Sequence, residues 1–163
     1  MNLTTAQLGT LKTWLTTNAS GLNDETSAAL LNAAQAGPNN IAWKTNVTIT
    51  QIGDKINGTE LAGLSTLNNT RLQTVVVLSQ SGINASLTDR RQFFDDIFSG
   101  AGGATTRANL LALWKRTITV GEKLFATGTG SDASPATFGF GVNNSSLEGL
   151  ITVANVSEAR NLP

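Results

Sequence analysis

The residues of this chain that could do chemistry are a small set of acids. Asp89, Asp95 and Asp96 offer carboxylates. Neighbouring residues on a helix point in different directions, so this spacing does not place two carboxylates over one scissile bond. We therefore interpret the three acids as part of a solvated helix face. The chain has no histidine and no cysteine, which removes the imidazole base, the thiolate nucleophile and the usual zinc ligands.

Two glycine-rich stretches of the sequence could in principle bind phosphate. Gly100–Gly103 precedes a predicted helix, the geometry in which backbone amides bind phosphate. It lacks the Gly-x-x-x-x-Gly-Lys-Ser/Thr order and follows no strand, so a hinge is favoured. The Gly-Thr-Gly sequence at 128–130 follows a helix, and a helix stop is favoured there. We predict that the protein is not an enzyme and holds no metal or cofactor.

The composition favours a protein that is made to contact other proteins. Charged residues make up 13% of the 163-residue chain and the net charge is zero, whereas soluble domains usually carry about 25% charged residues. Neutral polar and small residues replace them, which suits close contact between chains. The basic residues form no stripe, so specific nucleic-acid binding is not expected. No run approaches the roughly 20 apolar residues of a membrane helix, and we expect a soluble protein made in the cytoplasm.

Apolar residues at three- and four-residue spacing predict a mainly α fold. The segment 41–58 is ambiguous, because its β-branched residues suit a strand while the spacing of Ile49, Ile52 and Ile56 suits a helix. A short helix capped by Thr48 is favoured there. The other predicted helices span residues 4–18, 23–37, 59–82, 88–99 and 105–127. We thus expect a single helical-bundle domain of about five or six helices over residues 1–127.

Two apolar features of these helices bear on packing. Val75–Val77 have low helix propensity, so burial must hold that turn in place. Phe93, Phe94 and Phe98 are favoured as core residues that pack on Trp114 and Phe125.

The last 35 or so residues change character. Residues 128–135 are expected to form a flexible Gly/Thr/Ser linker, and 136–163 an extended β-hairpin arm followed by a short helix capped by Asn155. The strands are expected at 138–142 and 150–153, with a turn at 143–146. So short a hairpin needs a partner, either its own helices or a neighbouring chain, and both remain open.

Candidate interface residues come from this arm and from two tryptophans. Trp14 and Trp43 are less tied to an apolar stripe than the other large residues, and core and interface remain equally open for them. The candidates are Trp14, Trp43, Pro135, Phe138, Phe140, Val142, Leu150, Ile151 and Val153.

Several motifs resemble one known family. They are Lys115-Arg116 through Glu122-Lys123-Leu124-Phe125-Ala126-Thr127-Gly128-Thr129-Gly130, then Ser134-Pro135-Ala136-Thr137-Phe138, together with the helix at 90–98 and its Ser-Gly-Ala-Gly sequence, and Trp43-Lys44 beyond the opening helix. This pattern resembles small structural proteins encoded among the morphogenesis genes of tailed bacteriophages and prophages. A helical core with a C-terminal arm also resembles head-to-tail connector proteins.

The resemblance implies a component of the virion, assembled in the bacterial host cytoplasm. The expected partners are further copies of the chain in a ring of about twelve, the phage portal, and adjacent neck or tail proteins, with DNA passing through the lumen. A capsid decoration protein or a tail or baseplate ring protein is the alternative within the virion. A regulatory or assembly factor that is absent from the particle is the alternative outside it.

Overall fold

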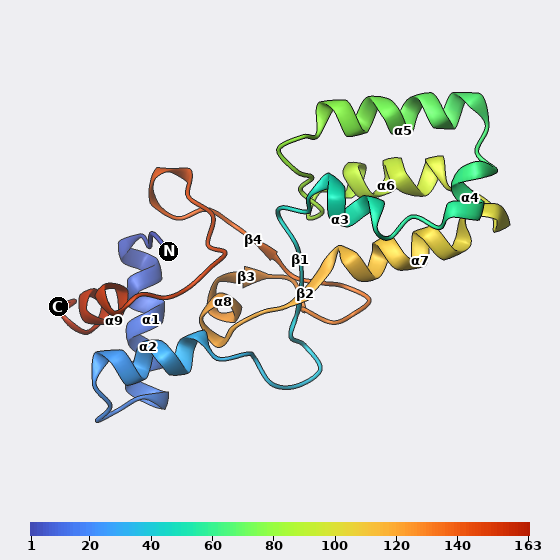
Figure 1. Cartoon of the computed structure of the whole chain (residues 1–163). Helices are drawn as coiled ribbons and strands as arrows, with labels where there is room; N and C mark the ends of the chain where they lie inside the picture. Colours follow the sequence, from blue (N-terminus) through green and yellow to red (C-terminus); the bar gives the residue numbers. More distant parts are fainter. The chain divides into compact units, whose positions relative to one another are not determined.

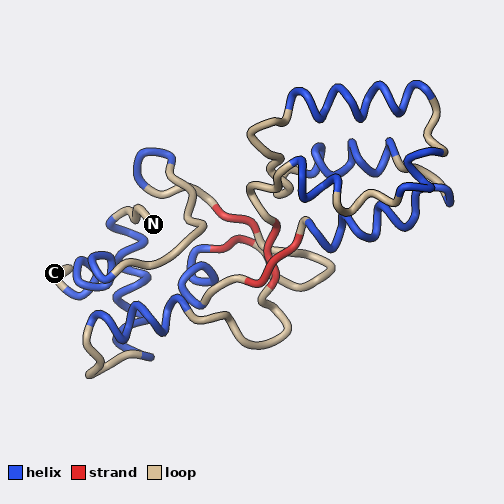
Figure 2. The backbone as a smooth tube through the Cα atoms, viewed as in Figure 1, coloured by secondary structure: helices blue, strands red, loops and turns tan.

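The computed structural model describes residues 1–163 and divides them into two compact units (Figure 1). Unit 1 combines Met1–Ala42 with Thr117–Pro163, and unit 2 is the continuous segment Trp43–Arg116. Nine α-helices and two two-stranded sheets confirm the mainly α prediction (Figure 2). The expected boundary at residue 127 does not separate the units, because residues from both ends of the chain build one core.

Unit 2 is built around a continuous apolar core. Phe94 and Phe98 are buried, and the Phe94 ring lies 5.6 Å from that of Trp114 between centroids. This confirms Phe94 and Phe98 as core residues. Phe93 is only partly buried, and Phe125 packs on the core of unit 1. The elements of unit 2 are α3 (Ile49–Gly53), α4 (Gly58–Ala62), α5 (Thr66–Leu78), α6 (Thr88–Ile97), the 3-10 helix η1 (Ala101–Gly103) and α7 (Ala104–Leu113).

Polar capping residues determine where the helices begin, and they explain which predicted helix bounds are confirmed and which are wrong. The Thr48 hydroxyl accepts a hydrogen bond from the Gln51 amide at 3.2 Å and begins α3, as predicted. The long helix expected from 59 to 82 is wrong, because Ser65 caps a new helix, α5. The helix expected from 105 to 127 is also wrong, because Thr119 caps a separate one after a strand. Apolar spacing continued across both breaks and concealed them.

Unit 1 gathers segments far apart in the sequence around one core. Leu11 and Leu31 from its first two helices are buried together with Leu147, Ile151 and Val156 from the end of the chain. The elements are α1 (Thr5–Asn18), α2 (Asp24–Asn32), α8 (Val120–Phe125), β3 (Ala126–Thr127), β4 (Thr137–Phe138), the 3-10 helix η2 (Val142–Asn144) and α9 (Val153–Arg160).

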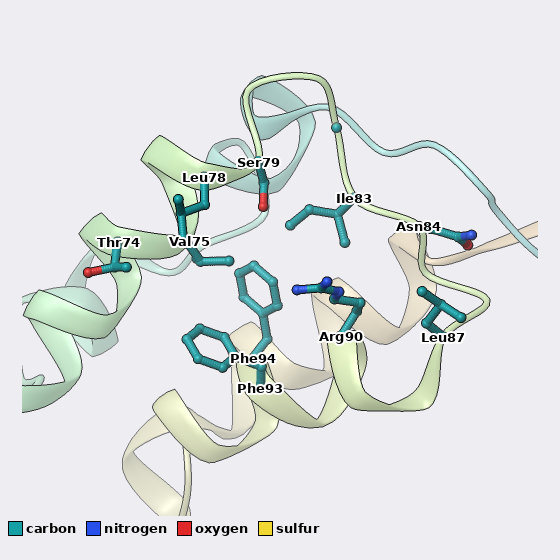
Figure 3. A pocket seen from close by; sticks show the side chains of 11 residues that line it. Thr74, Val75, Leu78, Ser79, Ile83, Asn84, Leu87, Arg90, Phe93 and Phe94 are labelled. Atoms are coloured by element: carbon teal, nitrogen blue, oxygen red, sulfur yellow. The ribbon is translucent and has the colours of Figure 1, made fainter.

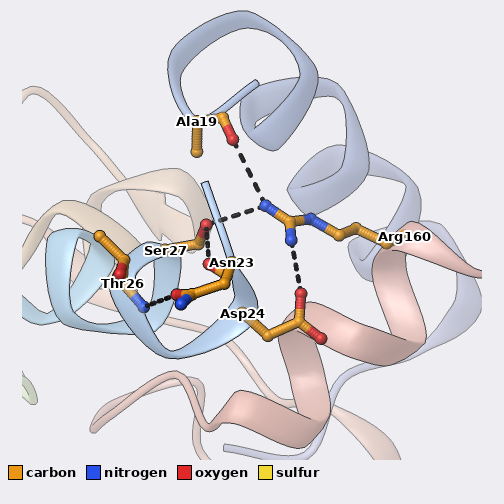
Figure 4. A network of polar contacts seen from close by, with 6 residues as sticks. All are labelled: Ala19, Asn23, Asp24, Thr26, Ser27 and Arg160. Atoms are coloured by element: carbon orange, nitrogen blue, oxygen red, sulfur yellow. Dashed lines mark hydrogen bonds and ion pairs between the residues drawn. The ribbon is translucent and has the colours of Figure 1, made fainter. Parts of the chain in front are cut away.

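The terminal helix α9 begins earlier than predicted and is fixed by an arginine. Thr152, and not Asn155, is its N-cap, since the Thr152 hydroxyl accepts from the Asn155 amide at 3.1 Å. The Arg160 guanidinium pairs with Asp24 at 2.5 Å and donates to the Ser27 hydroxyl at 2.9 Å (Figure 4). It also donates to the last turn of α1, at the Ala19 carbonyl. Helix α9 is thereby held on both α1 and α2.

The chain leaves unit 1 in β1 (Ile41–Trp43) and returns in β2 (Lys115–Thr117), and these two strands pair. The second sheet is antiparallel and places Ala126 opposite Phe138. Strand β4 therefore pairs with β3 and not with the predicted strand at 150–153.

The predicted extended arm is not confirmed. Leu150–Val153 does not form a strand, and α9 begins at Val153. The Asn32 side chain forms two hydrogen bonds with the Ile151 backbone, donating to its carbonyl at 2.8 Å and accepting from its amide at 2.9 Å. The Glu122 carboxylate, itself buried, accepts from the Gly149 amide at 2.8 Å. Because these contacts satisfy the backbone of this segment, it packs on its own unit.

The expected flexible linker forms a hydrogen-bonded turn. The Gly130 amide donates to the Ser134 carbonyl at 3.1 Å, and the Lys123 ammonium donates to the Thr129 carbonyl at 2.9 Å. Pro135, which follows, is buried. Residues 128–135 thus hold β3 and β4 in register.

Candidate functional site

The two tryptophans lie partly within the cores. Trp14 is half-buried against the core of unit 1, and Trp43 is half-buried against the core of unit 2. The Arg91 guanidinium lies 3.8 Å from the centre of the Trp43 ring. This cation–π contact covers part of the Trp43 surface.

The other seven candidates divide by exposure. Pro135 and Ile151 are buried and Phe138 is half-buried, so these three mainly support the fold. The remaining four are exposed, and together we name them the C-terminal surface: Phe140, Val142, Leu150 and Val153. Phe140 and Leu150 are the most open of these, at 64% and 62% exposed.

Phe140 stands on a tight turn. Asn143 and Asn144 both have positive φ, 56° and 57°, and the Ser145 amide donates to the Val142 carbonyl at 3.2 Å. Two central residues of positive φ define a type I′ turn, which Asn tolerates better than most residues. A turn is therefore present where one was predicted, at 142–145 and not at 143–146, and Phe140 pairs with Ser146 on its two sides.

A second apolar surface was not expected from the sequence. It is a groove of about 470 Å³ between α5 and α6, which we name the α5/α6 groove (Figure 3). Phe93 and Phe94 line it from α6, and the Arg90 side chain extends toward the Phe94 ring. Leu78 and Leu87 at its edge are 78% and 46% exposed.

The outer face of α5 continues this groove. Figure 1 shows α5 as the outer helix of unit 2, packed on α6. Its inner residues Leu72 and Val75 are 8% exposed, whereas Leu67 and Val77 are 60% and 64% exposed. The run Val75–Leu78 has more apolar positions than one helix face requires, and this excess is the signal that could have revealed the groove.

The polar groups between α6 and α7 mainly stabilise the fold. A depression there is lined by Arg91, Arg107, Asp95 and Asp96. Arg91 donates to the Ala85 carbonyl at 2.5 Å, and Arg107 donates to the carbonyls of Phe98 and Gly100. Partial burial raises the pKa of Asp95, an effect that the nearby Arg107 and Arg91 oppose. Arg91 thus satisfies a carbonyl in the segment before α6, and Arg107 satisfies carbonyls at the end of α6 and in the loop after it.

The amino end of α7 is already occupied by a carboxylate. Glu60 accepts from the Thr105 amide at 2.9 Å and from the Thr106 amide at 2.7 Å. The Thr106 hydroxyl and these amides hold the pKa of Glu60 at about 2, although desolvation raises it. The favoured interpretation of Gly100–Gly103 as a plain connector is consistent with this geometry, because Glu60 fills the position that a bound phosphate would take.

Comparison with protein-family models, with curated proteins and with solved structures finds no match for this chain. None of its helices combines the length and apolar character needed to span a bilayer. No three acidic side chains gather closely enough to form a metal site.

Proposed function

We propose that the protein is a non-enzymatic structural component of a tailed-phage virion and, within it, a subunit of the head-to-tail connector ring between portal and tail. The observation that carries the proposal is that each unit leaves apolar side chains exposed. In unit 1 they lie at the C-terminal surface, and in unit 2 at the α5/α6 groove. Apolar side chains that gather at the edge of a groove, as Leu78 and Leu87 do, are typical of a contact site.

The phage assignment is supported by the resemblance of 115–138 to phage morphogenesis proteins. The low charge of the chain is compatible with it as well. A channel that conducts DNA should not bind phosphates tightly, and the chain has eleven basic and eleven acidic residues with no basic stripe. In the proposed ring of about twelve copies, each subunit contacts the next through two different surfaces.

Within the virion, the C-terminal segment is proposed to contact a neighbouring subunit or ring. Phe140 and Leu150 are its exposed apolar side chains and would make this contact. The hydrogen bond of the Ile151 amide to Asn32 fixes the segment to its own unit. The contact therefore needs no detached arm, only docking of an exposed turn.

The test is quantitative mass spectrometry of purified phage particles. The proposal predicts this chain in the particle at the same copy number as the portal protein. Absence from the particle would favour the alternative of an assembly factor, and a copy number that follows the shell would favour a decoration protein. A chain that stays monomeric when mixed with the portal protein would contradict the connector role.

A further inference from the structure

We propose that Asn57 is a site of spontaneous covalent modification, at which deamidation is controlled by the opening of helix α4. Asn57-Gly58 is the only Asn-Gly pair in the chain. Glycine has no side chain to shield its backbone nitrogen or to restrict its dihedral angles, so this nitrogen reaches the preceding asparagine side chain more easily than that of other residues. The chemistry of this pair does not depend on the proposed role in the virion.

The reaction at this pair needs only water and hydroxide. The Gly58 backbone nitrogen loses its proton to hydroxide and attacks the side-chain carbonyl carbon of Asn57. A carbon–nitrogen bond forms to Gly58, the bond to the Asn57 Nδ2 breaks, and ammonia leaves after taking up a proton from water. Water then adds to one of the two carbonyl carbons of the succinimide ring and opens it. The product at position 57 is either aspartate or isoaspartate.

The folded chain holds Asn57 in a conformation that opposes ring closure. Asn57 is the N-cap of α4, and its side-chain oxygen accepts hydrogen bonds from the Thr59 and Glu60 amides at 3.0 Å and 3.1 Å. Its backbone is extended, and a ψ of 123° keeps the Gly58 nitrogen out of the plane that the five-membered ring requires. The backbone must therefore rotate, and both capping hydrogen bonds must break, before this nitrogen can attack.

Contacts with the start of α7 keep the α4 cap closed. The Asn57 amide donates to the Thr106 hydroxyl at 3.0 Å, and the Glu60 carboxylate accepts from the Thr105 and Thr106 amides. Figure 1 shows α4 beside this end of α7. Helix α4 has five residues and none of them is buried, so it is too short and too open to be stable by itself. It is therefore expected to open locally while the core of unit 2 stays folded.

Modification of Asn57 would act on these same contacts. In isoaspartate the main chain runs through the side-chain carbon, which inserts an extra methylene group into the backbone. The lengthened backbone no longer places the cap against the first turn of α4, and Glu60 moves away from the α7 amides that it now accepts from. A modified chain would thus lose the carboxylate at the amino end of α7.

Gly58 provides a matched control, because the fold does not require glycine at this position. A methyl group at position 58 would meet no other atom within 4 Å, and Gly58 does not have a left-handed φ. Alanine is more favourable than glycine in a helix. Gly58→Ala should therefore keep α4 intact, while its methyl group hinders attack by the backbone nitrogen.

Mass spectrometry of peptides from chains incubated at mildly alkaline pH measures the modification. Native and urea-unfolded samples of the unmodified chain would be compared, and aspartate and isoaspartate at position 57 quantified over time. Deamidation of Asn57 is expected to be at least about tenfold slower in the native chain, because it requires the opening of α4. In the unfolded chain Asn57 should react faster than every other asparagine, and Gly58→Ala should abolish this difference.

Thr106→Val tests whether the contact with α7 controls the reaction. The change removes the hydroxyl that accepts from the Asn57 amide. It should raise the rate of deamidation several-fold in the native chain and leave the rate in urea unchanged. Because Thr106 is fully buried, Glu60→Gln at a less buried position is the second variant, and it should change the native rate in the same direction.

Equal rates of deamidation in the native and unfolded chains would overturn control by α4. A native rate that neither Thr106→Val nor Glu60→Gln raises would overturn it as well. Faster deamidation of another asparagine in the unfolded chain would overturn Asn57 as the site.

Discussion

The two units of this chain are stabilised in different ways. Unit 2 is one continuous segment with an apolar core, in which Phe94 and Trp114 are almost fully buried. Unit 1 joins two segments from opposite ends of the chain, and single polar side chains connect them. Asn32 holds the Ile151 backbone, and Arg160 pairs with Asp24 and reaches the end of α1.

Polar side chains act as local caps in both units, but those that join the two chain ends of unit 1 span far more of the sequence than the contact of Glu60 with Thr105, 45 residues apart, in unit 2. In unit 1 a hydrogen bond spans more than a hundred residues, as between Asn32 and Ile151. In unit 2 the caps act mostly within three residues, as at Thr48 and Ser65. Mutations should therefore act on different parts of the chain in the two units.

The largest effect is expected from Phe94→Ala in unit 2. Removing a buried aromatic ring lowers the free energy of unfolding by about 3–5 kcal/mol. Because the two main cores share no residue, hydrogen exchange should rise in α5, α6 and α7 while α1 and α9 stay protected. Leu67→Ala, at a 60% exposed position, is the control and should change little. An equal rise in exchange in both units would contradict separate cores.

A smaller effect is expected from Asn32→Ala in unit 1. The change leaves the Ile151 amide and carbonyl without their partner and should lower the free energy of unfolding by about 2–3 kcal/mol in urea titrations. Asn18→Ala is the control, because the Asn18 side chain bonds to the Trp14 carbonyl on an exposed face of α1. An equal decrease in the free energy of unfolding for Asn32→Ala and Asn18→Ala would mean that Asn32 does not specifically connect the two segments of unit 1.

Arg160→Met should lower the free energy of unfolding by about 1–2 kcal/mol, because the ion pair with Asp24 is partly exposed and its two further hydrogen bonds are lost. A double-mutant cycle with Asp24→Asn measures the pairwise part. Arg71→Met on α5 is the control, as Arg71 makes only a long contact with Asn68. Additive losses in the cycle would show that the pair contributes nothing.

The smallest effect at neutral pH is expected from Glu60→Gln, since water can reach this side chain. The pKa of Glu60 is about 2 in the folded chain, below its ordinary 4.5. Its contribution is therefore complete above about pH 4.5 and is lost as the pH falls toward 2. The free energy of unfolding, measured from pH 7 to pH 2, should fall less steeply for Glu60→Gln than for the unmodified chain. Identical slopes below pH 4.5 would contradict the carboxylate cap on α7.

Local signals in the sequence predicted much of this fold. The caps Thr4, Asn23 and Thr48 begin helices where expected, and the aromatic residues of α6 form a core. Long helices across Ser65 and Thr119 were wrong, because apolar spacing continues through a break that only the cap reveals.

The sequence could not reveal contacts between the chain ends. The alternation at 138–142 indicated a strand, but its partner β3 and the packing of Ile151 depend on residues distant in the sequence. Four of the nine candidate interface residues prove to be exposed. The α5/α6 groove was missed because the exposure of Val77 and Leu78 depends on which face of α5 meets α6.

A cryo-electron microscopy map of the purified particle would test the proposed assembly most directly. The proposed function predicts ring density below the portal that fits this chain, with the C-terminal segment in contact with a neighbouring subunit or ring. Density on the shell or lower in the tail would contradict the connector role, and the absence of the chain from the particle would contradict a structural role in the virion.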